Sequence, residues 1–530
     1  MNQISAVAPA HVTQHWQLRK QAARGRGVVA SQAREAAEVG VAVLEAGGNA
    51  ADAAVATAFA LATVEPWNSG IGGIGFAVVH WAGERQSQTL DFGPIAPRGL
   101  RLDAFRLTGR MKQDLFAWPE VEGDANIHGP LSFVIPSSVA GYAALHARHG
   151  RMPLRDLIAP AVALAKRGLA QDWFTTLKIA NSASVLKLYA ESARIYLPGG
   201  MPPVPPYQGN PGYLQQGRLA ATLERLRDAG WEDFYSGEIA AAIVRDVRAM
   251  GGVLAAEDLA TCKPVWRPAL EADWRGRRLQ LANGLTAGPT MAEVVRAMQA
   301  LPARKGVPDT AWYAALSRAL RAAYDQRLKG LGAGTAPEPA ETCTTHLTVM
   351  DKDGNAVAMT TTLLSSMGSR VVLPETGVLM NNGVLWFDPT PGTPNAIAPG
   401  KRALCNMNPV ILLDEGGTKA AIAGGASGGR RILAAVYQML AFTADFGMSP
   451  EEAAHHPRID VSGPEGVTAD SRLPAETLQA LAADTPLTSV EHAVMPVNFA
   501  CPNLIQANGD GTATGISDAL SPWSAAWATG

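Results

Sequence analysis

The sequence has few cysteines and no long apolar run. Its 530 residues include only four cysteines, which stand far apart at Cys262, Cys343, Cys405 and Cys501. This spacing matches no metal-binding pattern and makes a poor disulfide framework for so long a chain. No segment supplies the roughly 18 apolar residues of a membrane-spanning helix, and the first residues lack the apolar stretch of a secretory signal. We therefore expect no metal, no membrane partner and a cytoplasmic location.

An excess of charge of either sign is also missing. The formal net charge is −2, with 17% charged and 47% hydrophobic residues. This balance argues against nucleic acid as the main partner, and the length is ample for a large core. Helical and strand-like segments alternate along the chain without repeats, which predicts a layered α/β or α+β fold.

Residues 342–362, TCTTHLTVMDKDGNAVAMTTT, predict a β-hairpin. Two strand-like runs flank DKDGN, which carries an Asp-Gly signal for a tight turn. The preceding residues 328–341 are rich in Gly, Pro, Ala and Glu, and they predict a linker that forms the only strong break in the chain, over 328–343.

A threonine at the start of this strand has a chemical use. A free α-amino group, with a pKa of about 8, can serve as the base for the hydroxyl of its own residue. Thr344 gains such a group only if the Cys343–Thr344 bond breaks, and from periodicity alone Thr344 is an ordinary strand residue.

The motif GIGGIG at residues 70–75 fits the pattern G-x-G-x-x-G. A dinucleotide-binding loop follows a strand and opens a helix. Here the expected order is reversed, because the motif follows a predicted helix and precedes the strand-like run FAVVHW. We therefore do not expect a nucleotide site.

The motif GASGG at residues 425–429 fits G-x-S-x-G and stands between a predicted strand and a predicted helix. That context suits a nucleophile elbow with Ser427 at its tip. His455 or His456 could be the base, and Asp445 or Asp460 the acid. A serine hydrolase is therefore one alternative; the other is a glycine-rich turn that points backbone N–H groups at a ligand.

Several longer motifs resemble one known family. GGNAADAAVATAFAL, VEPWNSGIGGIGF, TTHLTVMDKDGNAVAMTTTL and GGASGGRRI are spread over nearly the whole chain. In combination they resemble the γ-glutamyltransferase family of N-terminal-nucleophile (Ntn) hydrolases. The resemblance implies an α+β fold of four αββα layers and no cofactor. It also implies self-cleavage into residues 1–343 and 344–530, two chains of one domain that remain associated as a heterodimer, possibly as a dimer of heterodimers.

The resemblance also assigns catalytic positions. Thr344 matches the nucleophile, and Thr362 matches the second threonine, whose hydroxyl supports the first. Gly428 and Gly429 match the glycines whose amides form the oxyanion hole, where one donor typically contributes about 10²–10³ in rate. His346 has no chemical role in this assignment, and we expect it to be structural.

The sequence departs from the family where γ-glutamyl substrates are bound. A site that loses buried partners for charged groups rejects the ligand that carries them, often by about 10⁴-fold. We therefore do not expect glutathione as the substrate. Gly93 stands where the family has its carboxylate-binding Arg, and Leu364 stands where it has an Asn. Gly383 replaces a Gln, and Trp386 replaces the amine-binding Asp. Cys405 and Asn406 replace a Ser-Ser pair.

These departures favour a small anionic amide without an α-amino group. Arg430 follows the oxyanion glycines, and a guanidinium there could hold a carboxylate through two hydrogen bonds. Arg370 is a second candidate, and Trp386 and Asn406 complete the predicted substrate-binding set.

Within the family, the chain most resembles the oxamate amidohydrolase branch of purine catabolism, which implies hydrolysis of oxamate to oxalate and ammonia. The alternatives are an acylase for larger groups, such as the glutaryl side chains of cephalosporins, and a glutathione hydrolase or γ-glutamyltransferase. A protein that never matures, and acts only as a scaffold or binding protein, is a further alternative of another class.

Overall fold

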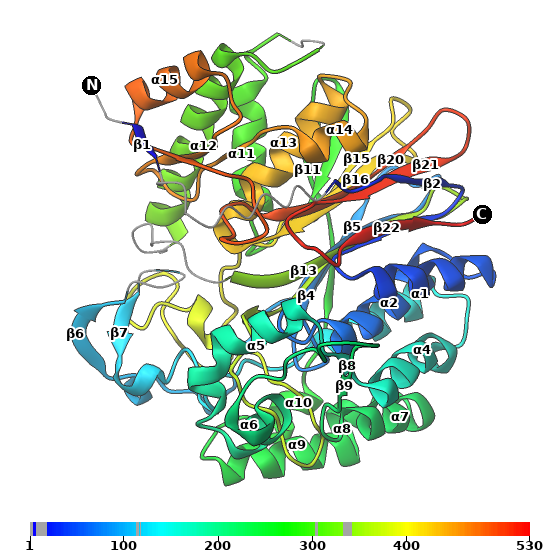
Figure 1. The fold of residues 1–530 in the computed structure, drawn as a ribbon, viewed down its shortest axis with the longest axis vertical. Coiled ribbons are helices and arrows are strands. Elements are labelled where there is room, and N and C mark those ends of the chain that lie inside the picture. The colour runs from blue at the N-terminus through cyan, green and yellow to red at the C-terminus, as the bar shows by residue number, and fades with distance from the viewer. Residues whose placement is uncertain (1–3, 7–18, 113–115, 117, 303–305, 332–341) are drawn as a thin grey trace.

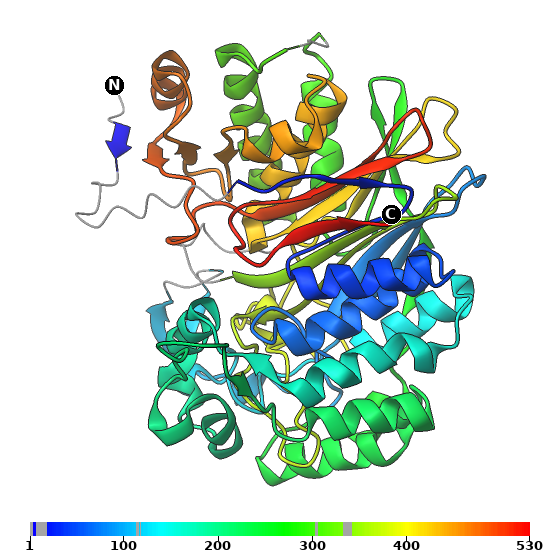
Figure 2. The same ribbon diagram turned by 45° about the vertical axis from the view of Figure 1, so that its right-hand side comes forward.

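A computed structural model describes residues 4–6, 19–112, 116, 118–302, 306–331 and 342–530. Two β-sheets lie face to face in the middle of the molecule, with helices over both outer faces (Figures 1 and 2). This is the four-layer αββα arrangement of an α+β sandwich, and it confirms the predicted fold class.

The two central sheets have seven strands each, and every strand pair in them is antiparallel. The first sheet has the order β10 (Val265–Pro268), β5 (Gln88–Phe92), β4 (Ile74–His80), β14 (Ala356–Ser365), β13 (Thr342–Met350), β3 (Val28–Ser31) and β22 (Ala525–Ala528). The second has the order β11 (Leu270–Trp274), β12 (Arg277–Leu281), β15 (Val410–Leu413), β16 (Ala420–Ser427), β20 (Cys501–Ala507), β21 (Ala513–Ser517) and β2 (Ala23–Gly25).

Each sheet has its own set of helices. The first sheet is covered by α1 (Arg34–Glu45), α2 (Ala50–Val64), α3 (Ser138–His149) and α4 (Leu154–Arg167), with α7 (Leu219–Ala229), α8 (Asp233–Ser236) and α9 (Glu238–Ala249) beyond them. The second is covered by α11 (Gly288–Met298), α12 (Thr310–Leu331), α13 (Ile432–Ala444), α14 (Pro450–His455) and α15 (Ala475–Asp484).

Smaller elements surround this sandwich. A four-stranded sheet pairs β1 (Ile4–Ala6), β19 (Leu487–Val490), β18 (Val467–Asp470) and β17 (Ile459–Asp460). Two short ribbons pair β6 (Leu107–Met111) with β7 (Pro119–Val121) and β8 (Leu169–Ala170) with β9 (Tyr213–Leu214). The remaining helices are α5 (Trp173–Leu186), α6 (Ala190–Tyr196), α10 (Ala256–Ala260) and the 3₁₀ turns η1 (Leu102–Ala104), η2 (Glu122–Asp124), η3 (Pro198–Gly200), η4 (Gly383–Trp386) and η5 (Gly429–Arg431).

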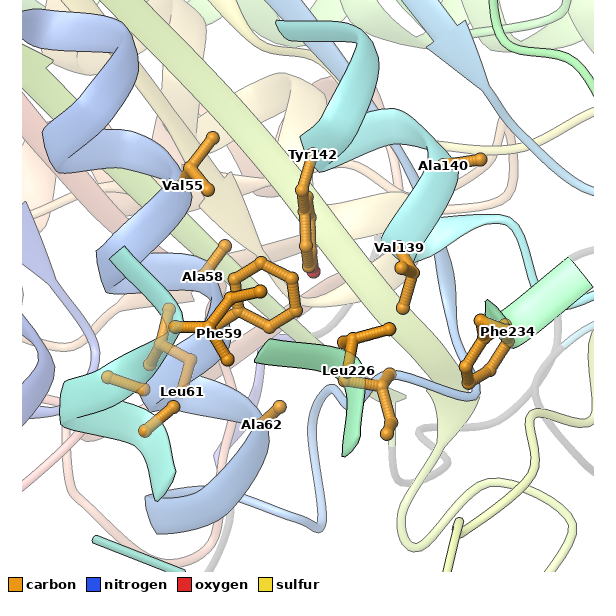
Figure 3. Close-up of a cluster of buried hydrophobic side chains, with 14 of the residues drawn as sticks. Val55, Ala58, Phe59, Leu61, Ala62, Val139, Ala140, Tyr142, Leu226 and Phe234 are labelled. Atoms are coloured by element: carbon orange, nitrogen blue, oxygen red, sulfur yellow. The ribbon is translucent and has the colours of Figure 1, made fainter. Parts of the chain in front are cut away.

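Apolar side chains fill the space between each pair of layers. Helix α2 is buried from Ala50 to Thr63, because it lies between the first sheet and the neighbouring helices. Figure 3 shows Phe59 of α2 beside Tyr142 of α3, whose ring centroids are 5.1 Å apart in an edge-to-face contact. A helix buried on all sides loses much stabilisation if it moves, so α2 gives the residues at its end a fixed position.

The hairpin that contains Thr344 lies at the centre of the first sheet. Strands β13 and β14 pair antiparallel across residues 351–355, which confirms the predicted hairpin. GIGGIG joins α2 to β4, so the motif lacks the order of a dinucleotide loop, as predicted. The predicted linker is shorter than expected, because α12 continues to Leu331 and β13 begins at Thr342. The rest of the linker lies outside the described residues.

Two kinds of feature are absent from the ranges that the structure describes. None of their helices is long and apolar enough to cross a bilayer. Those ranges also hold no group of three or more His, Cys, Asp or Glu side chains arranged to ligate a metal ion.

His346 of β13 fixes the spacing between the two central sheets. Its ring is fully buried, with Nδ1 2.8 Å from Thr360 Oγ1 and Nε2 3.1 Å from Thr348 Oγ1. Burial lowers the pKa of His346 to about 3, so the ring is neutral at physiological pH. The facing residue of the second sheet is Gly425, where a Cβ atom would stand 2.3 Å from the His346 ring. His346 therefore packs against bare backbone, as a structural histidine would.

The variant Gly425→Ala tests this packing. Because the added methyl group overlaps the His346 ring, we expect the free energy of unfolding to fall by about 1–3 kcal/mol. The matched control is Gly330→Ala in α12, where a Cβ atom would meet nothing within 4 Å. There we expect no loss, or a gain of up to about 1 kcal/mol. Denaturant midpoints of both variants measure this, and equal losses would contradict the packing.

Candidate active site

Thr344 lies at an irregularity in the β13–β14 pairing. Cys343 pairs with Leu364 and Thr345 with Thr361, so a β-bulge leaves Thr344 without a direct partner. Bulges bend a strand and redirect one side chain. The Thr344 hydroxyl is nearly buried, and it donates a hydrogen bond to Thr362 Oγ1 at 3.2 Å.

The Thr362 hydroxyl connects the two sides of the Cys343–Thr344 bond. It donates to the Cys343 carbonyl oxygen at 2.7 Å and accepts from Thr344 Oγ1 and from the Leu364 backbone N–H at 2.8 Å. One donated and two accepted bonds use the full capacity of a hydroxyl group. Thr362 therefore holds the Thr344 hydroxyl oxygen and the Cys343 carbonyl in one fixed arrangement.

A cavity of about 340 Å³ opens beside Thr344, and Ser427 and Gly428 also line it. Gly428 has φ +132°, and a Cβ atom there would stand 2.8 Å from Ala500, so only glycine suits this position. Arg431 holds the loop in place by donating from Nε to the Gly428 carbonyl at 3.3 Å and from Nη1 to the Val497 carbonyl at 2.6 Å. The loop of Gly428 and Gly429 thus reaches the same cavity as the hydroxyl of Thr344.

A buried carboxyl group lies on another wall of this cavity. Glu65 follows α2, is 2% exposed, and accepts from Asn68 Nδ2 at 2.5 Å. Burial raises the pKa of Glu65 to about 7, although the nearby Thr345 hydroxyl and Lys178 ammonium each lower it in part. A group with a pKa near neutrality can exchange a proton under ordinary conditions.

Hydrogen bonds link Glu65 to Ser427, which directly precedes Gly428 and Gly429. Asn68 Nδ2 also donates to Gln32 Oε1 at 3.3 Å, and Gln32 Nε2 donates to Ser427 Oγ. Four residues at this site, Gln32, Glu65, Asn68 and Arg431, were not predicted from the sequence. Glu65 and Asn68 stand in the motif VEPWNSG, which was a usable signal, but nothing in the sequence marks Gln32.

The structure does not assemble a serine triad at Ser427. His455 and His456 line a different cavity, of about 1160 Å³, which Ser427 does not line. His455 Nε2 lies 3.1 Å from the Lys20 carbonyl, and His456 packs edge-on against Phe442.

The two candidate acids are also occupied elsewhere. Asp445 accepts from Trp274 Nε1 and Arg275 Nε, and Asp460 accepts from Ser462. The Ser427 hydroxyl is contacted by Gln32 and not by a histidine. The alternative of a serine hydrolase with Ser427 as its nucleophile is therefore wrong.

Three of the positions where the family is expected to bind a substrate glutamate hold residues of one apolar cluster. Leu364, Trp386 and Cys405 belong to this buried cluster, together with Phe116 and Trp118. None of the five lines the Thr344 cavity. The side chains at these three positions therefore present hydrocarbon, aromatic and thiol surface.

Arg430 lies beside this apolar cluster. Its side chain is 6% exposed, and its guanidinium carbon is 5.9 Å from the centre of the Phe116 ring. Neither Nη1 nor Nη2 has a hydrogen-bond partner among the described residues. Burial, with the nearby Arg327 cation, lowers the pKa of Arg430 to about 10. A buried cation without a bonded partner is costly, and an anion placed there would remove much of that cost.

The other two predicted substrate-binding residues have partners in the fold. Arg370 Nη1 donates to Ser365 Oγ at 2.8 Å and to the Gly368 carbonyl at 2.7 Å. Asn406 Oδ1 accepts from Arg327 Nη2 at 3.2 Å, and Arg327 also holds the Cys405 carbonyl. The cavity beside Thr344 is not lined by either residue, so their role toward a substrate stays a prediction.

Comparisons with known proteins agree with this geometry. A family model described as gamma-glutamyltranspeptidase matches residues 36–341 and 333–526. The solved structure of cephalosporin acylase from Bacillus halodurans has a TM-score of 0.83 and 25% identity, and the match covers 98% of this chain and 99% of that one.

Two curated relatives align over most of the chain. The glutathione hydrolase proenzyme of Escherichia coli (strain K12) is 29% identical, with 93% of this chain and 90% of the relative covered. The acylase ACY 1 proenzyme of Pseudomonas sp. (strain V22) is 30% identical, with 94% and 93% covered.

Fold and similarity together define an enzyme of the Ntn-hydrolase class that acts on amide bonds. Within that class, the chain belongs to the gamma-glutamyltranspeptidase family.

The raised pKa of Glu65 predicts how stability depends on pH. The folded pKa, about 7, lies above the ordinary value of 4.5, so the unfolded chain ionises first as the pH rises. The free energy of unfolding therefore falls as the pH rises from 4.5 to 7, and by pH 8 the total loss reaches ~3 kcal/mol. Glu65→Gln removes this loss because glutamine does not ionise.

We expect Glu65→Gln to gain stability relative to the parent between pH 4.5 and pH 8. Denaturant titrations at both pH values measure the change, with both proteins carrying Thr344→Ala so that their covalent structure is the same. Parallel pH dependence in the two proteins would contradict the buried, weakly acidic state of Glu65.

Proposed function

We propose that this protein is an amidohydrolase that cleaves its own Cys343–Thr344 bond and then uses the freed Thr344. The observation that supports this most is the pair of hydrogen bonds at Thr362, to the Thr344 hydroxyl and to the Cys343 carbonyl. Cleavage would give chains of 343 and 187 residues, the second being the 530 less the first 343. The names of the relatives, both proenzymes, agree with such a maturation.

After cleavage the new α-amino group of Thr344 takes the proton from the Thr344 hydroxyl, whose oxygen attacks the substrate amide carbonyl. The negative oxygen that forms would accept hydrogen bonds from the amides of Gly428 and Gly429. The amino group passes its proton to the departing amine, and water then hydrolyses the Thr344 ester.

For the substrate, we propose an amide whose acyl group carries a carboxylate and no α-ammonium group. The side chains of Leu364, Trp386 and Cys405 themselves offer no counter-charge for an ammonium group, and the nearby Asp91 carboxylate is already paired with Arg267 and Arg402. The Arg430 guanidinium, buried and without a bonded partner among the described residues, offers one for a carboxylate. Acylases and a glutathione hydrolase are similar to this chain to about the same degree, so these side chains, and not the similarity, support an acylase of this kind, such as one for glutaryl groups.

Oxamate is the second candidate, and the position of Arg430 directly after Gly429 favours it. Oxamate carries its carboxylate next to the amide carbonyl, so both could be held by adjacent residues of this loop once the Arg430 side chain turns from Phe116 toward Thr344. Its hydrolysis would release oxalate and ammonia.

The variant Thr344→Ala tests the maturation. The wild-type protein should separate into two chains, and the smaller should begin with Thr344. The variant should remain one chain, because it lacks the attacking oxygen. Intact-mass measurement distinguishes these outcomes, and a variant that still cleaves at the same bond would contradict the proposal.

A panel of amides tests the substrate. We expect glutaryl-p-nitroanilide to react faster than γ-glutamyl-p-nitroanilide, which differs only by its α-ammonium group, and ammonia release from oxamate tests the smaller substrate. Faster reaction of the γ-glutamyl compound would overturn the proposed substrate class.

The variant Arg430→Met tests the carboxylate contact. Loss of a buried charge pair should lower kcat/KM for the preferred anionic amide by roughly 10²-fold. The methyl ester of the same substrate is the control, and its kcat/KM should change less than about threefold. Equal losses for both substrates would show that Arg430 supports the fold instead of the substrate carboxylate.

A further inference from the structure

Self-cleavage poses a proton-transfer problem that the mature enzyme does not have. In the continuous chain the nitrogen of Thr344 is part of an amide, so it cannot act as the base for the Thr344 hydroxyl. The Thr362 hydroxyl donates its own proton to the Cys343 carbonyl and is a poor proton acceptor. Some other group must therefore receive the proton of Thr344 Oγ1.

Few ionisable groups face the space where this proton leaves. Among the described residues that line the cavity with Thr344, Glu65, Lys178 and Arg431 carry charged groups. An ammonium or guanidinium ion has no lone pair to accept a proton. His346 does not line the cavity, and both of its ring nitrogens contact threonine hydroxyls between the sheets. Glu65 is the one carboxylate in this set.

The position of Glu65 suits proton transfer. One oxygen is held by Asn68, while Oε2 is buried without a hydrogen-bond partner in the described part of the chain. A buried carboxyl oxygen left unpaired in this way costs free energy and calls for a functional explanation. The cavity that it shares with Thr344 has room for the water molecule that a short relay would need.

We propose that Glu65 is the base of self-cleavage, taking the Thr344 hydroxyl proton directly or through one water molecule. This proposal rests on the proposed cleavage between Cys343 and Thr344. As the proton moves to Glu65, Thr344 Oγ1 bonds to the Cys343 carbonyl carbon. When the C–N bond then breaks, Glu65 returns the proton to the Thr344 nitrogen, which becomes the free amine. Water finally hydrolyses the ester to a Cys343 carboxylate and the Thr344 hydroxyl.

The groups that face Glu65 are compatible with this role. Lys178 comes from α5, the Thr345 hydroxyl from β13 and the Cys501 thiol from β20. Burial raises the pKa of Cys501 well above its usual value, so this thiol stays neutral. The Lys178 ammonium favours the ionised form of Glu65 and burial opposes it, and the resulting pKa of about 7 allows the carboxyl to accept and return a proton.

The test follows self-cleavage of freshly made precursor, produced by cell-free synthesis, between pH 5 and pH 9 by intact mass. The wild-type rate should rise through pH 7 and then level off, as Glu65 ionises. Glu65→Gln should cleave about 10²-fold more slowly at pH 8, a typical loss for a general base, and without the inflection near pH 7. Glu65→Asp should cleave slowly but keep an inflection, because it retains a carboxylate.

A matched control tests whether cleavage needs Glu65 in particular or any buried carboxyl group at an end of α2. Asp52, fully buried at the opposite end of the same helix, caps α2 through the Asn49 backbone N–H. Asp52→Asn should cleave within about threefold of wild type, with the same pH profile.

The outcomes separate the two proposals. Wild-type and Glu65→Gln precursors that cleave within threefold of each other, or that share the inflection, would overturn the role of Glu65 alone. A Thr344→Ala precursor that cleaves at the same bond would overturn the proposed maturation itself.

Discussion

The contact between two threonine hydroxyls on neighbouring strands is the constraint on which the rest of the site depends. Thr344 and Thr362 meet at 3.2 Å where the β13–β14 register shifts by one residue, so that Thr362 and Leu363 of β14 lie opposite Thr344 alone. Both strands lie inside a seven-stranded sheet that is covered by a second sheet and by helices. A hydroxyl contact built on such rigid elements keeps its geometry, which a site on loops would not.

Two different environments lie near this contact. The cavity beside Thr344 holds Glu65, Gly428 and a chain of amide and hydroxyl groups. The apolar cluster begins at Leu364, whose N–H bonds to Thr362, and it includes Trp386, with Arg430 beside its Phe116. The cavity holds groups suited to move protons, and beside the apolar cluster the Arg430 and Arg327 guanidinium groups lie in a setting of low polarity. In such a setting, a carboxylate gains more from a guanidinium than it would in water.

Much of the fold could be predicted because the signals were local. Alternating residues around DKDGN specified the β13–β14 hairpin, and the order of helix, glycine loop and strand excluded a dinucleotide loop. The catalytic roles predicted for Thr344, Thr362, Gly428 and Gly429 come from motifs that resemble one family, and they stay predictions. The end of α12 was missed because Gly and Lys after residue 327 are compatible with either a helix or a linker.

The rest could not be read from the sequence because it depends on contacts between distant segments. Gln32 reaches Ser427 across 395 residues, because Gln32 follows a strand of the first sheet and Ser427 ends a strand of the second, and no local pattern predicts how the two sheets stack. The side-chain directions at Arg430 and Arg431 follow from the tight turn η5, in which Arg431 bonds to the Gly428 carbonyl and Arg430 points toward Phe116. From the sequence, Arg430 is expected to lie close to Gly428 and Gly429. Only the fold shows that Arg431 lines the Thr344 cavity and that Arg430 does not.

The most direct test of the central claim is to locate the acyl group during turnover. The mature protein would be mixed with glutaryl-p-nitroanilide, quenched in acid within the first turnovers, digested and examined by mass spectrometry. Our account predicts a glutaryl group on the peptide that begins with Thr344, attached to its hydroxyl oxygen. A glutaryl group on Ser427, or on an uncleaved chain, would contradict the role of Thr344 as the nucleophile.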